Sequence, residues 1–140
     1  MRYWDASALV ALCVAETNTS AVRPLARAGI VTWAVSAVEI ASAIERRTRE
    51  GNLTDAERAA ARAALGELAA AWTEIAALGP VRERAMRLVA THVLRVADAM
   101  QLGAALVAVS DRPVGHDFVC ADVRLGNAAA REGFRLLPEA

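Results

Sequence analysis

The chain of 140 residues is predicted to fold as an α/β domain, an α/β/α sandwich in which helices cover both faces of a central parallel sheet. Two observations predict this class. Short apolar runs of β-prone residues alternate with longer segments of helical periodicity along the whole chain. The strand candidates are apolar, which is typical of strands that are buried on both faces. With right-handed crossovers this order gives one domain, residues 1–140, around one central sheet.

Five runs are expected to form the strands of this sheet. Each is short and contains β-branched or aromatic residues, which favour extended structure. Between these runs lie segments with apolar residues at helical spacing. The expected strands are residues 2–4, 30–34, 73–78, 118–121 and 134–137, and the expected helices are residues 7–15, 21–28, 36–49, 54–72, 81–91, 99–109 and 123–132.

Several helix starts carry recognisable signals. Thr54 with Glu57, and likewise Ser36 with Glu39, match the capping box. In this motif a hydroxyl and a carboxyl group three residues apart satisfy free N–H groups of the first turn. Asp98 directly precedes the helix of residues 99–109, so its default interpretation is an N-cap.

Composition excludes several classes of protein. No apolar run reaches membrane-spanning length and the N-terminus lacks the pattern of a signal peptide, so we expect a cytoplasmic protein without a membrane partner. Cys13 and Cys120 lie in apolar segments without neighbouring ligands, which predicts small buried side chains and no zinc site. Sixteen basic and sixteen acidic residues balance, so binding to nucleic acid would require a local cluster of arginines.

Acidic residues recur at one type of junction. Asp5 and Asp122 each follow a predicted strand and precede a predicted helix. Asp98 and Glu39 lie at the start of helices. Because the carboxyl ends of parallel strands meet at one edge of the sheet, where ligands gather, we expect these carboxyl groups to face that edge. Ser7 is placed to hydrogen-bond a carboxylate or a metal-bound water, or to cap the helix that follows.

Four carboxylates at one edge need a compensating charge. At separations of several ångströms each pair repels by roughly 1 to 4 kcal/mol, so such a cluster requires a cation or a shared proton. Oxygen ligands without histidine or cysteine suit Mg²⁺, with Mn²⁺ as a plausible substitute. The chemistry that uses such sites most is phosphodiester hydrolysis, in which the metal activates water and neutralises charge on the phosphate.

Two arginines are expected to contact phosphate at this site. Arg112 and Arg124 flank its expected mouth, and a guanidinium group can bind two phosphate oxygens at once. Asp117, in contrast, precedes its strand and is expected at the opposite edge of the sheet as a loop residue. It is therefore not counted among the acids of the site.

The residues around these acids resemble the PIN-domain nucleases, and among them the VapC-type toxins of bacterial toxin–antitoxin pairs. The matching segments, which extend over nearly the whole chain, are residues 3–9, Glu39, residues 97–102 and 104–106, and residues 121–125 with Gly133-Phe134. The resemblance implies that the catalytic, metal-binding acids are Asp5, Glu39, Asp98 and Asp122, with Ser7 supporting the first of them. Whether Glu39 is a ligand or a capping residue stays open.

The resemblance also implies a function and partners. It indicates a Mg²⁺-dependent endoribonuclease that acts as a toxin, is held by a cognate antitoxin and pairs as a homodimer. The helices of residues 7–15 and 21–28 are so apolar that one side, including Val10, is expected to form an exposed groove for the antitoxin.

Other interpretations start from the same acids. The main alternative is a PIN-like scaffold that binds protein or RNA without catalysis. A haloacid-dehalogenase-like phosphatase would need a second aspartate where Ser7 stands. A response-regulator receiver would need an acid pair before its first helix and a lysine, and the chain has no lysine.

Overall fold

The strands of the chain form one parallel sheet. The computed structural model describes residues 1–139 and contains β1 (Arg2–Trp4), β2 (Val31–Trp33), β3 (Thr73–Ile75), β4 (Asp117–Val119) and β5 (Arg135–Leu137). These strands are hydrogen-bonded in the order β3-β2-β1-β4-β5, and every pairing is parallel. The α/β class predicted from the alternating pattern is therefore confirmed.

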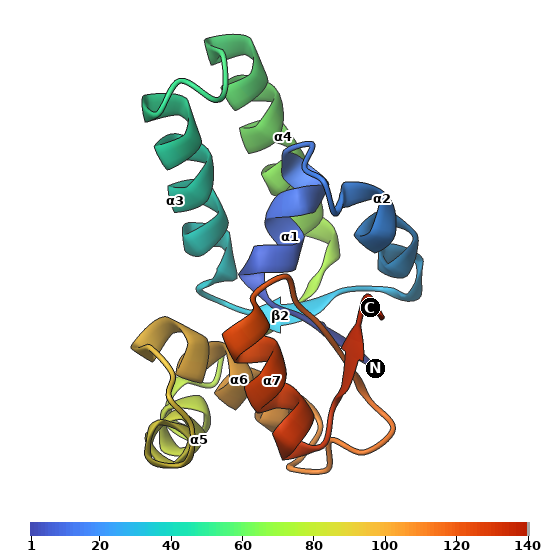
Figure 1. The fold of residues 1–140 in the computed structure, drawn as a ribbon, viewed down its shortest axis with the longest axis vertical. Helices are drawn as coiled ribbons and strands as arrows, with labels where there is room; N and C mark the ends of the chain where they lie inside the picture. The colour runs from blue at the N-terminus through green and yellow to red at the C-terminus, as the bar shows by residue number, and fades with distance from the viewer. Residues whose placement is uncertain (140) are drawn as a thin grey trace.

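Helices cover both faces of this sheet. They are α1 (Ala6–Cys13), α2 (Thr19–Val22), the 3-10 helix η1 (Arg23–Ala28), α3 (Ser36–Arg49), α4 (Asp55–Ala71), α5 (Leu78–Thr91), α6 (Val96–Ala108) and α7 (Val123–Glu132). In Figure 1, α1 to α4 lie above the sheet and α5 to α7 lie below it. The arrangement is the three-layer sandwich that the sequence predicts.

Two neighbouring side chains of β1 lie in separate hydrophobic cores, one on each face of the sheet. Successive side chains of a strand point to opposite sides of the sheet. Trp4 therefore packs with Ile40 in the core beneath α1, α3 and α4. Tyr3 packs with Leu102 and Phe118 in a second core beneath α5, α6 and α7. Both β1 side chains are fully buried, so the strand anchors the two layers of helices to each other.

One of the two predicted capping boxes forms. The Glu57 N–H donates to the Thr54 hydroxyl at 3.1 Å, and the Thr54 N–H donates to the Glu57 carboxylate at 2.9 Å. The prediction of a capping box at Ser36 is wrong, because α3 has Val35 at its N-cap and Ser36 inside the helix. The Ser36 hydroxyl lies instead 2.7 Å from that of Thr32 in the buried interior.

Two helix starts also differ from the prediction. α6 begins at Val96 with Arg95 at its N-cap, so Asp98 lies in the first turn and is not an N-cap. Ala97 favours helix, and the helix therefore extends back beyond Asp98. The helix predicted over residues 21–28 is α2 followed by η1. Pro24 has no N–H to donate, which explains why a regular α-helix does not continue through it.

On residues 7–15 the predicted exposed apolar groove does not form. Leu9 is fully buried and Val10 is 5% exposed, and both pack in the core with Ile44 of α3. Because α1 lies between the sheet and the α3–α4 pair, its apolar side chains belong to the fold. Glutamate at Val10 would therefore place a charge in the core, and it would not report on a partner surface.

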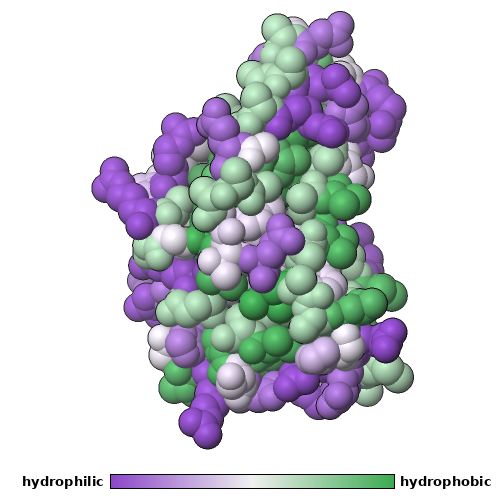
Figure 2. Space-filling model, turned by 180° about the vertical axis from the view of Figure 1, so that it is seen from behind, coloured by the Kyte–Doolittle hydropathy of each residue, from purple (hydrophilic) through white to green (hydrophobic). Residues whose placement is uncertain are grey.

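Exposed apolar side chains gather instead on α5 and α6. Met86 and Val89 of α5, Val93 after it and Val96 of α6 are all about half exposed or more. With Met100, several of them line an apolar groove of about 300 Å³ between these helices. Figure 2 shows the hydrophobic surface concentrated over the lower half of the molecule, where α5 and α6 lie in Figure 1. No helix within residues 1–139 is long and apolar enough to cross a membrane.

Candidate active site

The first turns of four helices approach one another at the carboxyl edge of the sheet. α1, α3 and α7 follow β1, β2 and β4 within a few residues, and α6 begins near the same edge (Figure 1). This topology carries the four predicted acids to one side of the molecule, as expected where parallel strands end. Each acid lies at the start of a helix, where the helix dipole favours negative charge.

Asp5 is almost completely buried, with 3% of its surface exposed. It caps α1 by accepting from the Ser7 N–H at 3.1 Å, and the Ser7 hydroxyl donates to the same carboxylate oxygen. The Ser7 hydroxyl also accepts from the Ala121 N–H at 3.0 Å. Ser7 thereby connects the β1–α1 junction to the β4–α7 junction and orients the Asp5 carboxylate.

Asp122 begins α7 beside a cysteine. Its carboxylate accepts from the Leu125 N–H at 3.0 Å, as an N-cap does. Its own N–H donates to Cys120 Sγ at 3.3 Å, and this sulfur lies 3.7 Å from Asp5 Oδ2. Because β4 ends at Val119, Cys120 contacts the acids, which corrects the prediction that it only fills space in the core. Burial, with the charge of Asp5, raises the pKa of Cys120 and keeps it a neutral thiol.

A depression of about 410 Å³ opens beside Asp98 and Asp122. Arg95 and Arg124 line it as well, and both arginines are exposed. Arg95 Nε lies 3.5 Å from Asp98 Oδ2. Two carboxylates and two guanidinium groups therefore share one opening, a combination able to contact both a cation and a phosphate.

Glu39 joins these acids from the first turn of α3. Its Oε1 accepts from Gln101 Nε2 at 3.1 Å. Burial raises the pKa of Glu39 to about 7, the hydrogen bond from Gln101 opposes this change, and the charges of Asp5 and Asp98 add to it. Glu39 is therefore a side chain that gains and loses a proton near neutral pH.

The acids also influence one another's ionisation. Burial raises the pKa of Asp5 to about 6 against the hydrogen bonds from Ser7, and the charge of Asp98 contributes to the increase. Burial and then the charge of Asp122 raise the pKa of Asp98. Carboxyl groups that are buried near one another with raised pKa values are characteristic of functional sites.

The acids do not form a closed metal cage. Within residues 1–139, no three acidic, histidine or cysteine side chains are arranged to hold one metal ion together. Mg²⁺ keeps several waters, however, and proteins commonly hold it through one or two carboxylates together with substrate phosphates. The oxygen donors of Asp98 and Asp122 in one depression fit a hydrated ion of this kind. The full metal set of Asp5, Asp98 and Asp122 stays a prediction.

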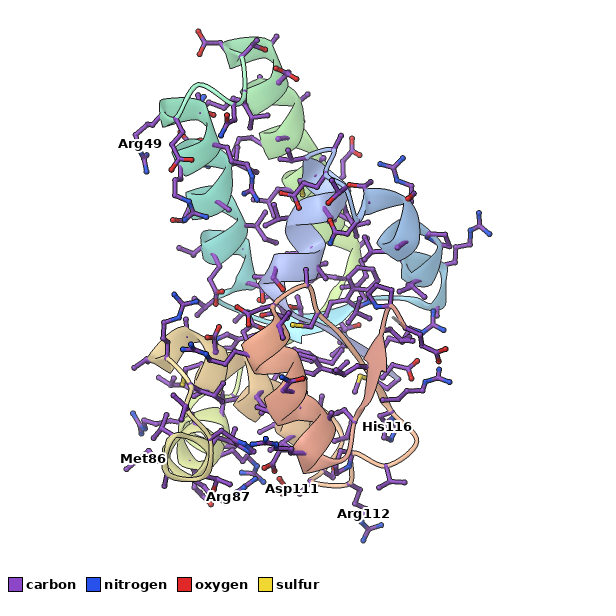
Figure 3. All side chains as sticks on the ribbon, in the orientation of Figure 1. Arg49, Met86, Arg87, Asp111, Arg112 and His116 are labelled. Carbon is purple, nitrogen blue, oxygen red and sulfur yellow. The ribbon has the colours of Figure 1, made fainter. Side chains whose placement is uncertain are left out.

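The structure places Arg112 away from this opening. α6 runs from the carboxyl edge to the opposite edge of the sheet, and Asp111 and Arg112 follow its far end (Figure 3). Arg112 therefore does not flank the mouth as predicted. Asp117 lies at that opposite edge as expected, but it is the first residue of β4 and not a loop residue. It accepts from Arg2 Nε at 2.9 Å and from Arg135 Nε at 2.8 Å.

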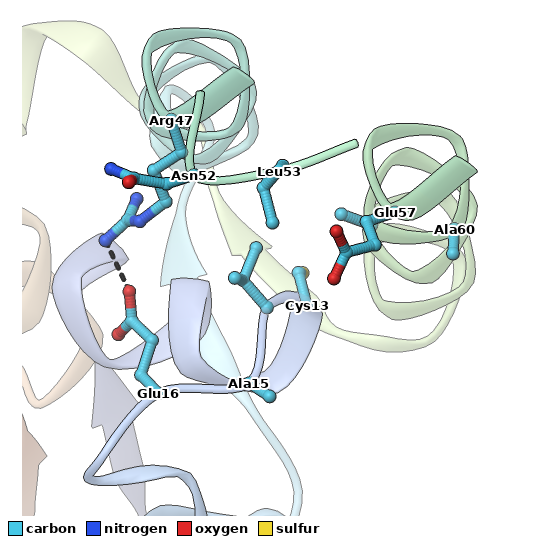
Figure 4. Close-up of a pocket in the computed structure, with 10 residues that line it drawn as sticks. Cys13, Ala15, Glu16, Arg47, Asn52, Leu53, Glu57 and Ala60 are labelled. Carbon is cyan, nitrogen blue, oxygen red and sulfur yellow. Dashed lines mark hydrogen bonds and ion pairs between the residues drawn. The ribbon is translucent and has the colours of Figure 1, made fainter. Parts of the chain in front are cut away.

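A second cavity, of about 380 Å³, lies between the end of α1, the end of α3 and α4 (Figure 4). The ion pair of Arg47 with Glu16 forms one side of it, and Leu53 and Ala61 contribute apolar walls. Cys13 also lines the cavity, and burial raises the pKa of its thiol to about 11. None of the four predicted acids lines this cavity.

Sequence reasoning assigned no role to Gln101 or Arg95. Gln101 is the one polar residue in the apolar stretch 99–109, which was an available signal. Arg95 precedes Asp98 by three residues, the spacing at which helical side chains meet, but its position at the N-cap is visible only in the structure.

The comparisons with known proteins give a fold and no activity. No protein-family model matches the chain, and no curated protein matches it. The structure is similar to the crystal structure of PAE2754 from Pyrobaculum aerophilum, with a TM-score of 0.68 over 97% of this chain and 88% of that chain. The two sequences are 21% identical, so the likeness shows the fold alone.

Proposed function

We propose that the chain is a Mg²⁺-dependent endoribonuclease that acts as the toxin of a toxin–antitoxin pair. The observation that carries the nuclease proposal is the depression in which Asp98 and Asp122 lie beside Arg95 and Arg124. Metal-assisted hydrolysis of a phosphodiester can use groups of both kinds, because a carboxylate holds the cation and a guanidinium group holds the phosphate. The resemblance to VapC-type PIN-domain nucleases supports RNA as the substrate.

Each residue of the site has a distinct part in this proposal. Bound Mg²⁺ would supply an activated water and neutralise the charge that develops on the phosphate. Asp98 and Asp122 would hold the ion, with Asp5 behind them, and Arg124 and Arg95 would bind the phosphates on either side of the opening. Glu39, with its pKa of about 7, is suited to accept or hold a proton at neutral pH.

An RNA cleavage assay tests the nuclease proposal. Cleavage of a structured RNA is measured for the purified parent, for Asp98→Asn and for Asp111→Asn. Each protein is assayed over a titration of Mg²⁺ or Mn²⁺. Asp111 is a matched control, because it is an exposed aspartate paired with Arg84 at the far end of the same helix. Cleavage by the parent and by Asp111→Asn, with loss in Asp98→Asn, is the expected result.

Two other results lead to different conclusions. RNA binding without cleavage at any metal concentration would favour the alternative of a non-catalytic PIN-like scaffold. Neither binding nor cleavage of any RNA would contradict both proposals.

We propose that a helix of the antitoxin binds in the cavity between α1, α3 and α4. Its apolar walls can receive apolar side chains, and the Arg47–Glu16 pair can orient a polar group. Ala60 lines the cavity and is exposed, so Ala60→Glu adds a charge there without disturbing the core. We expect this variant to lose co-purification with the protein encoded immediately upstream and to keep its cleavage activity. Undiminished binding would place the antitoxin elsewhere.

The proposed homodimer has a surface of its own. The groove between α5 and α6 is lined by apolar residues and one arginine, Arg82. Met86 is 69% exposed, and Met86→Glu is expected to convert a dimer into a monomer in analytical ultracentrifugation without unfolding the chain. A dimer that survives this substitution would have to pair through another surface.

A further inference from the structure

Gln101 is a polar side chain inside the largely apolar helix α6. It is fully buried, and its neighbours in α6 are apolar, with Leu102 fully buried and Met100 partly buried. A primary amide removed from water destabilises the fold unless it is hydrogen-bonded. The partners of Gln101 therefore account for its presence at this position.

The amide of Gln101 bridges β1 and the start of α3. Its Oε1 accepts from the Tyr3 hydroxyl at 2.6 Å. Its Nε2 donates to the Ser36 hydroxyl at 2.9 Å and to Glu39 Oε1 at 3.1 Å. Both N–H bonds of the amide and its oxygen are thereby satisfied, and one of the partners is an acid of the candidate site.

The hydrogen bonds around this amide run in one direction. The Thr32 hydroxyl donates its only hydrogen to the Trp4 carbonyl at 2.7 Å. The Ser36 hydroxyl must then donate to Thr32, which leaves Ser36 Oγ to accept from Gln101. A flipped amide would present its oxygen to Glu39 and break this chain. The network therefore fixes the amide so that one N–H always faces the Glu39 carboxyl group.

We infer, on the basis of the proposed function, that Gln101 is a positioning residue that holds the Glu39 carboxyl group toward the other acids. Glu39 is only partly buried, and its long side chain has rotamers that would turn it out to solvent. The bond from Gln101 selects the inward orientation. Turned inward, the Glu39 carboxylate places negative charge beside the ion that Asp98 and Asp122 would hold, so its orientation affects metal binding. Residues behind the ligands of a metal typically change metal affinity or activity by about 10- to 100-fold when they are removed.

A double-mutant cycle read by Mn²⁺ affinity tests this role. Isothermal titration calorimetry measures Mn²⁺ binding to the parent, to Gln101→Met, to Glu39→Ala and to the double variant, and RNA cleavage is measured in parallel. Gln101→Met keeps the length of the side chain and removes its hydrogen bonds. We expect it to weaken Mn²⁺ binding by about tenfold in the parent and to have no further effect in the Glu39→Ala background.

A matched control separates positioning from packing. Leu106→Val removes apolar volume from a buried position of the same helix without touching the network, and Mn²⁺ binding should stay at the parent's value. If Gln101→Met fails to fold, Tyr3→Phe removes only the hydroxyl that fixes the amide and is read in the same cycle. A smaller loss of affinity is expected for Tyr3→Phe, again absent when Glu39 is alanine.

The possible results separate this inference from the proposed function. Unchanged Mn²⁺ affinity in Gln101→Met, or an equal loss with and without Glu39, would overturn the positioning role. A parent that binds Mn²⁺ and cleaves no RNA would refute the ribonuclease, while the cycle would still decide the role of Gln101. A parent that binds no Mn²⁺ would overturn both.

Discussion

Asp5 and Asp117 are buried aspartates at opposite edges of the same sheet, and their pKa values shift in opposite directions. At the amino edge, burial alone would raise the pKa of Asp117, but hydrogen bonds from Arg135 and Arg2 outweigh it and lower the value. At the carboxyl edge, burial raises the pKa of Asp5 to about 6. Within residues 1–139, the side chain of Asp5 is hydrogen-bonded to Ser7 and Cys120, neither of which is a cation.

The difference between the two edges lies in what each acid contributes. An aspartate held between two arginines connects β1, β4 and β5 and stabilises the fold. Buried acids that repel one another destabilise the fold unless a cation joins them. At the carboxyl edge Asp98 is paired with Arg95, but Asp5 is hydrogen-bonded to no cationic side chain within residues 1–139, which supports the proposal that a cation binds at this edge. The following substitutions test this difference.

The largest expected effect is on catalysis. Asp98→Asn should reduce RNA cleavage by on the order of a hundredfold or more, since loss of a partner merely behind a metal ligand already costs up to about that factor. Asp117→Asn should leave cleavage at the parent's rate. Initial rates at matched Mn²⁺ concentration measure both. Equal loss in the two variants would mean that the edges do not divide function in this way.

The pH dependence of stability should differ at the two edges. Between about pH 4 and 7 the folded chain keeps protons on Asp5 and Glu39 that the unfolded chain has released, so these groups make stability fall as pH rises through this window. Relative to the parent, the free energy of unfolding of Asp5→Asn should rise by up to about 3 kcal/mol between pH 4 and pH 7.5.

Asp117 has a lowered pKa, so its carboxylate stabilises the fold above its ordinary pKa, and this stabilisation is lost as pH falls through the lowered pKa. Urea unfolding in metal-free buffer with EDTA measures both trends, and parallel pH curves for parent and Asp5→Asn would contradict the first.

At the amino edge the expected cost is in stability. Asp117→Asn leaves Arg2 and Arg135 without their carboxylate, and Arg2 is 25% exposed at its side chain. The free energy of unfolding at pH 7 should fall by about 1 to 3 kcal/mol. A urea titration at constant m-value measures it. If the variant were as stable as the parent, the ion pairs of this edge would be replaceable by water.

Much of the fold and part of the site follow from local sequence. The alternation of strand and helix patterns predicts the parallel sheet, and the positions of Asp5 and Asp122 between a strand and a helix predict that both lie at its carboxyl edge. These patterns involve residues close together in the chain, so they can be recognised from the sequence alone.

The rest of the site depends on residues that are far apart in the chain. The pairs Ser36 with Glu39 and Thr54 with Glu57 have the same spacing, yet only the second forms a capping box. The Ser36 hydroxyl accepts a hydrogen bond from Gln101, which is 65 residues away in the chain. Gln101 in turn accepts one from Tyr3, which is 98 residues away. Arg112 was misplaced for a related reason, because the direction in which α6 crosses the sheet decides the edge at which Arg112 lies.

The smallest expected effects come from these two similar hydroxyl groups. Thr54→Ala removes a true N-cap far from the acids, so it should cost about 1 kcal/mol of stability and leave Mn²⁺ affinity unchanged. Ser36→Ala removes no cap but leaves an N–H of Gln101 unpaired, at a similar cost of about 1 kcal/mol. Because the amide then loses one of the contacts that orient it toward Glu39, Mn²⁺ affinity should also fall, by less than the roughly tenfold expected for losing the whole amide. Calorimetry on both variants, alongside urea unfolding, separates the two roles. A Ser36→Ala protein with the parent's Mn²⁺ affinity would show that its hydroxyl serves the fold alone, as that of Thr54 does.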